Sequence, residues 1–70
     1  MTTAEIKGRE RVHSLTTKEI IIQFEMTETI NNEYIPTVRG WYMDELESRD
    51  AEAFDRWMDS EEDSPRKFYI

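Results

Sequence analysis

The 70-residue chain contains no cysteine, and this absence excludes several kinds of protein. Secreted domains of this size are normally held together by disulfides, so we expect a reducing compartment and a cytoplasmic protein. Thiol catalysis and zinc sites built on cysteine are excluded as well. Long apolar runs are also missing, since the longest is Ile20-Ile21-Ile22 and the first residues do not have the composition of a signal peptide. We therefore expect no membrane segment.

Residues that usually carry catalysis are few. With only two glycines there is no Gly-rich phosphate loop. The single histidine, His13, stands beside Ser14, but a nucleophile and its base also need a third group that orients them, so we expect a solvated loop histidine. Asp44 and Glu47 on one helix would not face each other across a cleft as paired catalytic carboxylates do. The acidic run 59–63 lacks the central glycine of a calcium-binding EF-hand loop. The sequence therefore predicts a protein that is not an enzyme and uses no cofactor or metal.

Positive charge is scarce. Sixteen acids stand against nine bases, which gives a net charge of −7. Residues 19–63 alone carry fourteen acids and three arginines, a sum of −11, whereas residues 1–18 and 64–70 each sum to +2. Because a phosphate backbone favours positively charged proteins, we expect no direct nucleic-acid partner. Eight aromatic residues (two Trp, three Tyr and three Phe) are more than a disordered acidic tail would have.

The length of the chain predicts one small domain, residues 1–70. A chain of this size buries only about 60% of the surface that its unfolded form exposes. A deep active-site cavity is difficult to build in so small a core. Residues 1–15 are expected to be a loose, irregular N-terminal segment, and residues 60–70 an acidic loop followed by an apolar tail. The tail either folds back over the core or is presented to a partner.

Two helices are predicted in the second half of the chain. In residues 51–59 the apolar side chains form one continuous stripe, with Asp50 at the N-cap position. Residues 37–49 place apolar side chains at i, i+3, i+4 and i+8, with Thr37 as the expected N-cap. Gly40 inside this helix either permits close backbone packing or marks a later start.

Residues 17–30 are open to two interpretations. Apolar residues fall on the even positions, as in a β-strand: Ile20, Ile22, Phe24, Met26 and Ile30. Thr16 and Glu19, however, have the spacing of a capping box, which favours a helix. We predict an all-α fold, a small three-helix domain with an irregular N-terminal segment and a C-terminal tail. The alternative is an α+β fold in which residues 18–27 form a strand.

A resemblance to a class of proteins rests on three stretches of the sequence. They read Val38-Arg39-Gly40-Trp41-x-Met43-Asp44-Glu45-Leu46-Glu47-x-Arg49, then Ala53-Phe54-x-x-Trp57, and then Ser64-Pro65-Arg66-Lys67-Phe68. Together these resemble small uncharacterised acidic proteins of phages and conjugative elements in Gram-positive bacteria. The resemblance implies a helical cytoplasmic protein of a mobile element. It implies no activity and no site residues.

The expected function is protein binding. A dense negative charge can steer the chain onto a basic protein surface, so we expect an inhibitor or accessory factor of a mobile element. A structural or regulatory homodimer is the alternative, and a small transcription factor is a minor one. The candidate partner-binding residues combine acids with aromatics: Trp41, Asp44, Glu47, Asp55, Asp59, Glu61, Glu62, Asp63, Phe68 and Tyr69.

Overall fold

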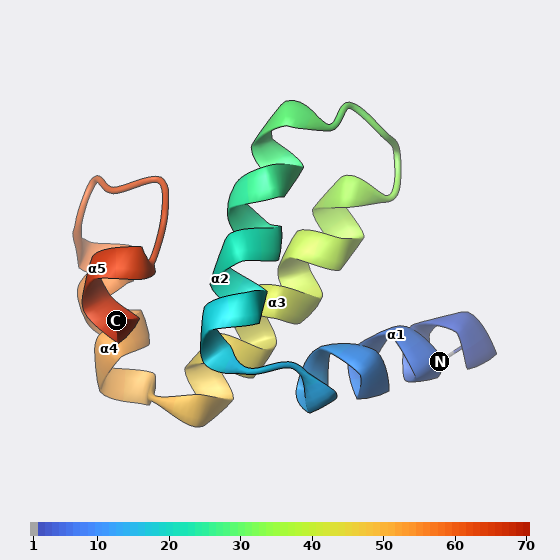
Figure 1. Cartoon of the computed structure of the whole chain (residues 1–70), viewed down its shortest axis with the longest axis horizontal. Helices are drawn as coiled ribbons and strands as arrows, with labels where there is room; N and C mark the ends of the chain where they lie inside the picture. The colour runs from blue at the N-terminus through green and yellow to red at the C-terminus, as the bar shows by residue number, and fades with distance from the viewer. Residues whose placement is uncertain (1) are drawn as a thin grey trace.

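The computed structural model describes residues 2–70, and over this range the chain is helical with no strand (Figure 1). The elements are α1 (Thr3–Ser14), α2 (Thr17–Met26), the 3₁₀ turn η1 (Thr27–Thr29), α3 (Ile35–Arg49), α4 (Ala51–Asp59) and α5 (Arg66–Tyr69). The all-α prediction is confirmed. The prediction of three helices is wrong, because α1 and α5 are additional helices.

Helix α2 forms where the even-position pattern suggested a strand. Ile20, Ile21 and Phe24 are fully buried, whereas Ile22 and Met26 are 38% and 58% exposed. Burial at i, i+1 and i+4 is the pattern of one helix face. The capping box starts the helix as predicted, since the Thr16 hydroxyl accepts from the Glu19 amide at 3.1 Å and the Glu19 carboxylate accepts from the Thr16 amide at 2.9 Å.

Helices α3 and α4 follow the sequence prediction closely. Helix α4 has the predicted bounds, and the Asp50 carboxylate accepts from the Ala53 amide at 3.0 Å, as an N-cap should. Helix α3 begins at Ile35, two residues earlier than predicted, because Pro36 is readily accommodated in the first helical turn. Thr37 therefore lies inside the helix, and its predicted N-cap role is wrong.

Helix α1 is the main correction to the sequence prediction, which described residues 1–15 as irregular. Its N-cap is Thr2, whose hydroxyl accepts from the Glu5 amide at 3.1 Å. Apolar residues in α1 are sparse: Val12 is its buried residue and Ile6 is exposed. This helix has no long apolar stripe and is stabilised by packing against α3. At this contact Gly8 lies directly against the Trp41 ring.

Helix α3 is the centre of the molecule and contacts α1, α2 and α4. Helices α2 and α3 run antiparallel as a hairpin, with α1 on one side of it and α4 and α5 on the other (Figure 1). In the core Trp57 of α4 meets Phe24 of α2 edge to face, with ring centroids 5.3 Å apart, and Phe54 meets the same Trp57 ring at 5.8 Å. This aromatic contact joins α4 to the hairpin.

The C-terminal tail folds back onto the protein. Phe68 and Tyr69 are partly buried against the core. The Tyr69 hydroxyl donates to the Leu46 carbonyl at 2.8 Å and to the Asp50 carbonyl at 3.2 Å, where α3 ends and α4 begins. Burial and, after it, the charges of Asp50 and Glu47 raise the pKa of Tyr69 to about 12.

The two glycines are expected to respond oppositely to alanine. A Cβ on Gly8 would overlap the Trp41 ring, whereas a Cβ on Gly40 would have nothing within 4 Å, so the close approach lies at Gly8 and not at Gly40. Gly40→Ala is expected to raise the free energy of unfolding by about 0.5–1 kcal/mol through helix propensity. Gly8→Ala is expected to lower it by about 1 kcal/mol or more through overpacking. Urea titrations followed by circular dichroism measure both, and a stabilising Gly8→Ala would contradict the α1–α3 contact.

Candidate functional site

Five exposed carboxylates between residues 47 and 63 take part in no ion pair within residues 2–70, and we call this set the acidic surface. Asp55 and Asp59 are exposed on α4, and their helical positions lie opposite the buried Ala53 and Trp57. The remaining members come from the end of α3 and the loop after α4, so that the surface comprises Glu47, Asp55, Asp59, Glu61 and Asp63. Within residues 2–70 none of these five takes part in an ion pair.

The cations near the acidic surface are already engaged. Residues 44–63 hold ten acids and two bases, Arg49 and Arg56. Arg49 pairs with Glu45 at 2.9 Å and Arg56 pairs with Glu52 at 2.6 Å. The Lys67 ammonium is held at 2.9 Å by the Glu62 carboxylate. The acidic surface therefore keeps its charge uncompensated by the chain itself.

The other predicted partner-binding residues have contacts within the chain. Asp44 is exposed but pairs with Arg9 of α1 at 3.1 Å. Glu62 pairs with Lys67, and Phe68 and Tyr69 pack inward with the tail as described above. Trp41 is partly buried between α3 and α1. Five of the ten predicted residues are thus exposed and without an ion pair within residues 2–70, and the other five have contacts within the chain.

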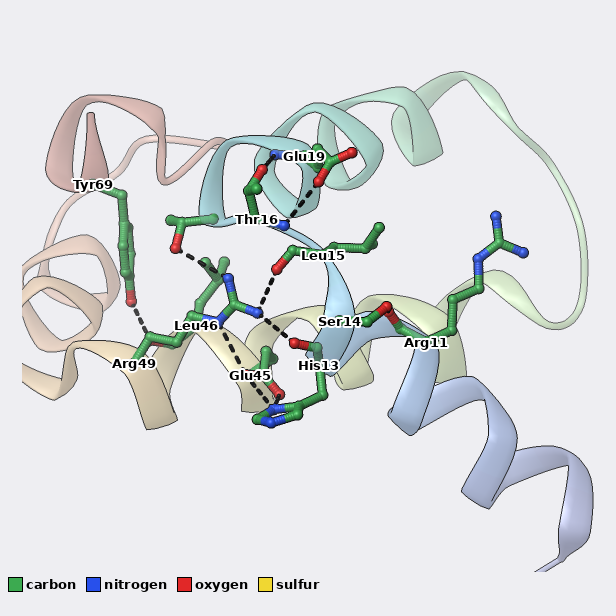
Figure 2. A network of polar contacts seen from close by, with 11 residues as sticks. Arg11, His13, Ser14, Leu15, Thr16, Glu19, Glu45, Leu46, Arg49 and Tyr69 are labelled. Atoms are coloured by element: carbon green, nitrogen blue, oxygen red, sulfur yellow. Dashed lines mark hydrogen bonds and ion pairs between the residues drawn. The ribbon is translucent and has the colours of Figure 1, made fainter.

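A polar network centred on Arg49 fixes the junction of α1, α2 and α3 (Figure 2). Its guanidinium donates to the His13 carbonyl at 3.1 Å, to the Leu15 carbonyl at 2.6 Å and to the Thr17 hydroxyl at 3.1 Å. The first two acceptors are carbonyls at the end of α1, which lack partners within that helix. Arg49 therefore caps α1 from α3, across a gap of 34 to 36 residues in the sequence.

Glu45 completes this network. Its carboxylate accepts from the Arg49 guanidinium at 2.9 Å and lies 3.1 Å from the His13 ring nitrogen Nδ1. Burial raises the pKa of Glu45, but the hydrogen bonds from Arg49 and His13 outweigh it and hold the pKa below its ordinary value. His13 lies in the last turn of α1 and pairs with Glu45, which corrects the prediction of a loop histidine. The arrangement is a structural clamp, because the histidine contacts a carboxylate that the Arg49 guanidinium already holds.

An apolar groove lies where α1, α2 and α3 meet. It consists of two adjoining hollows of about 330 and 350 Å³, and four residues line both: Arg11, Gln23, Val38 and Tyr42. The first hollow continues to Gly8, Val12, Leu15 and Trp41, and the second to Met26, Thr27, Ile30 and Ile35. Sequence analysis missed this groove because its lining comes from three helices. No local signal in the sequence marks it, because Met26 and Ile30 fall on the even positions together with the buried Ile20 and Phe24.

Comparisons with known proteins and the geometry of residues 2–70 add three findings. No family model, curated protein or solved structure matches this chain significantly. No helix in the described range is long and apolar enough to cross a membrane. Among residues 2–70 no three side chains of His, Asp or Glu come together in a group that could hold a metal ion.

Proposed function

We propose that this chain is a non-enzymatic protein-binding module, and that its acidic surface docks on a basic surface of a partner protein. The observation that carries this proposal is the uncompensated charge of Glu47, Asp55, Asp59, Glu61 and Asp63. The two arginines within residues 44–63 already pair with other carboxylates. Like charges held on a small fold repel one another and lower its stability. A basic partner relieves that repulsion, and exposed carboxylates accelerate its approach.

The chemistry of the proposed partner follows from the carboxylates. Closely spaced carboxylates are an anionic surface that can stand in for phosphates, so a protein with a phosphate-binding groove lined by Lys and Arg is a suitable partner. Occupying such a groove would inhibit or redirect the partner without any bond being made or broken. We propose that this module acts in the cytoplasm as an accessory factor of a mobile element. The proposed function uses no cofactor.

Two triple variants test the proposal with the same change in net charge. Asp55→Lys/Asp59→Lys/Glu61→Lys reverses the acidic surface. Glu10→Lys/Glu28→Lys/Glu33→Lys reverses three exposed acids elsewhere that also make no ion pair within residues 2–70. Each tagged chain is used to capture proteins from source cells, and mass spectrometry identifies them. We expect the wild type and the control variant to capture the same protein, and the acidic-surface variant to capture none of it. Equal capture by both variants would contradict the proposal.

A homodimer is the second candidate function. The observation that favours it is a group of exposed apolar side chains on and after α2, which includes Ile22, Met26, Ile30 and Tyr34. Such side chains would be covered if two copies paired, and a small core gains most from such pairing. Light scattering on the purified chain distinguishes the candidates, because a stable dimer favours this one and a monomer favours docking on another protein.

A further inference from the structure

The apolar groove is a second surface, separate from the acidic one, and its charge has the opposite sign. Arg11 is the only charged residue that lines either hollow. In the part of the chain that the structure describes, its guanidinium makes no ion pair. Figure 2 shows the Arg11 side chain extending away from the network around Glu45 and Arg49. A free arginine between two apolar hollows is suited to a ligand with a carboxylate between two apolar groups.

Gln23 adds a second donor at the same place. Its side-chain oxygen accepts from the Tyr42 hydroxyl at 2.9 Å. The amide nitrogen is the other terminal atom of this side chain, and it is a hydrogen-bond donor. Gln23 and Arg11 both line the two hollows, so a carboxylate at their junction would meet a guanidinium and an amide donor together.

The backbone surroundings of the groove favour a helical ligand. Most residues that line it belong to α1, α2, the η1 turn and α3, and the other two, Leu15 and Ile30, directly follow α1 and η1. Helical backbone offers no row of free amides and carbonyls to pair with an extended peptide, so the ligand must satisfy its own backbone hydrogen bonds. Along α3 the lining runs from Ile35 through Val38 to Tyr42, about 10 Å at 1.5 Å per residue. That length matches about two turns of a docked helix.

We propose that this groove binds an amphipathic helix of another protein, with two apolar side chains about two turns apart in the hollows and an Asp or Glu between them on Arg11 and Gln23. A second copy of this chain is a less suitable occupant, because each copy carries a net charge of −7 and two copies repel one another. Helix α1, which lines the first hollow, and helix α4, which carries Asp55 and Asp59, lie on opposite sides of the α2–α3 hairpin (Figure 1).

A phage-displayed random peptide library is the probe for this proposal. Selection on the full chain is expected to enrich peptides with apolar residues at helical spacing and an acid between them. Affinity for these peptides is expected to fall about tenfold or more in Arg11→Glu, because a like-charge contact costs several kcal/mol. Selection on Arg11→Glu should replace the acid with Lys or Arg. The control Lys18→Glu reverses another exposed cation that lies outside the groove and should leave affinity unchanged.

Two further variants test the apolar part of the groove. Met26→Lys places a charge in the second hollow, whereas Met58→Lys makes the same change at a similarly exposed methionine on α4. We expect Met26→Lys to abolish peptide binding. Met58→Lys and the acidic-surface variant should both leave peptide binding intact. The proposal would be overturned if the enriched peptides lacked an acid, or if Arg11→Glu bound them as tightly as the wild type. It would also be overturned if the wild type were a dimer that Met26→Lys converts to monomers. The last result would assign the groove to a second copy.

Discussion

Replacing Trp57 with alanine is expected to lower the free energy of unfolding by about 3–5 kcal/mol, as removal of a core aromatic usually does. The Trp57 side chain is 4% exposed and meets Phe24 and Phe54 edge to face. Its indole nitrogen also donates to the Glu62 carbonyl at 3.0 Å, which holds the loop after α4. A core in a chain of this length rarely supplies more than about 3–5 kcal/mol, so most of the variant should be unfolded.

Urea titration followed by circular dichroism measures this effect. Met58→Ala is the matched control, because Met58 is the next residue on α4 and is 45% exposed. We expect Met58→Ala to stay within about 0.5 kcal/mol of the wild type, as surface substitutions usually do. If Trp57→Ala unfolds cooperatively with the same urea midpoint as the wild type, Trp57 does not hold α4 to the hairpin.

Replacing Arg49 with methionine is expected to lower the free energy of unfolding by about 2–3 kcal/mol. The substitution keeps most of the length of the side chain but removes its donors to the Thr17 hydroxyl and to the His13 and Leu15 carbonyls. It also leaves the partly buried Glu45 carboxylate without its closest cation. Arg49→Lys should be intermediate, because an ammonium keeps the charge but cannot reproduce the planar fork of the guanidinium.

Hydrogen exchange distinguishes loss of the clamp from a general loss of stability. We expect Arg49→Met to speed exchange most in α1, whose last carbonyls Arg49 caps. Arg56→Met is the control, because Arg56 pairs only with Glu52 and both side chains are largely exposed, at 69% and 76%. An exposed pair of this kind contributes about 0.5 kcal/mol or less. Equal effects of Arg49→Met and Arg56→Met on hydrogen exchange in α1 would contradict the conclusion that Arg49 caps this helix.

Local signals in the sequence predicted the starts of α2 and α4 correctly. The apolar stripe and the Asp50 cap of α4 lie within ten consecutive residues, and the capping box that starts α2 within four. Such elements are visible in the sequence because the residues that form them are neighbours along the chain. The high density of acids in residues 19–63 is visible for the same reason, since charge density is a property of a stretch of sequence.

Long-range contacts explain what sequence analysis missed. Helix α1 has few apolar residues, and its stability depends on Trp41 and Arg49 of α3. Its one local signal was Thr2 followed three residues later by Glu5, the same spacing that marked Thr16 and Glu19. The apolar groove has no local signal of its own, because it exists only once three helices have packed together.

The salt dependence of association tests the central claim most directly. The captured partner is mixed with wild-type chain or with the acidic-surface variant in a stopped-flow instrument at about 0.01 M and about 0.15 M salt, over which range the screening length falls from about 30 to about 8 Å. We predict that the wild-type association rate constant falls about tenfold or more at the higher salt, and that the variant associates slowly at both. Association of wild type and variant at equal rates, unchanged by salt, would contradict the claim that the acidic surface docks on a basic partner.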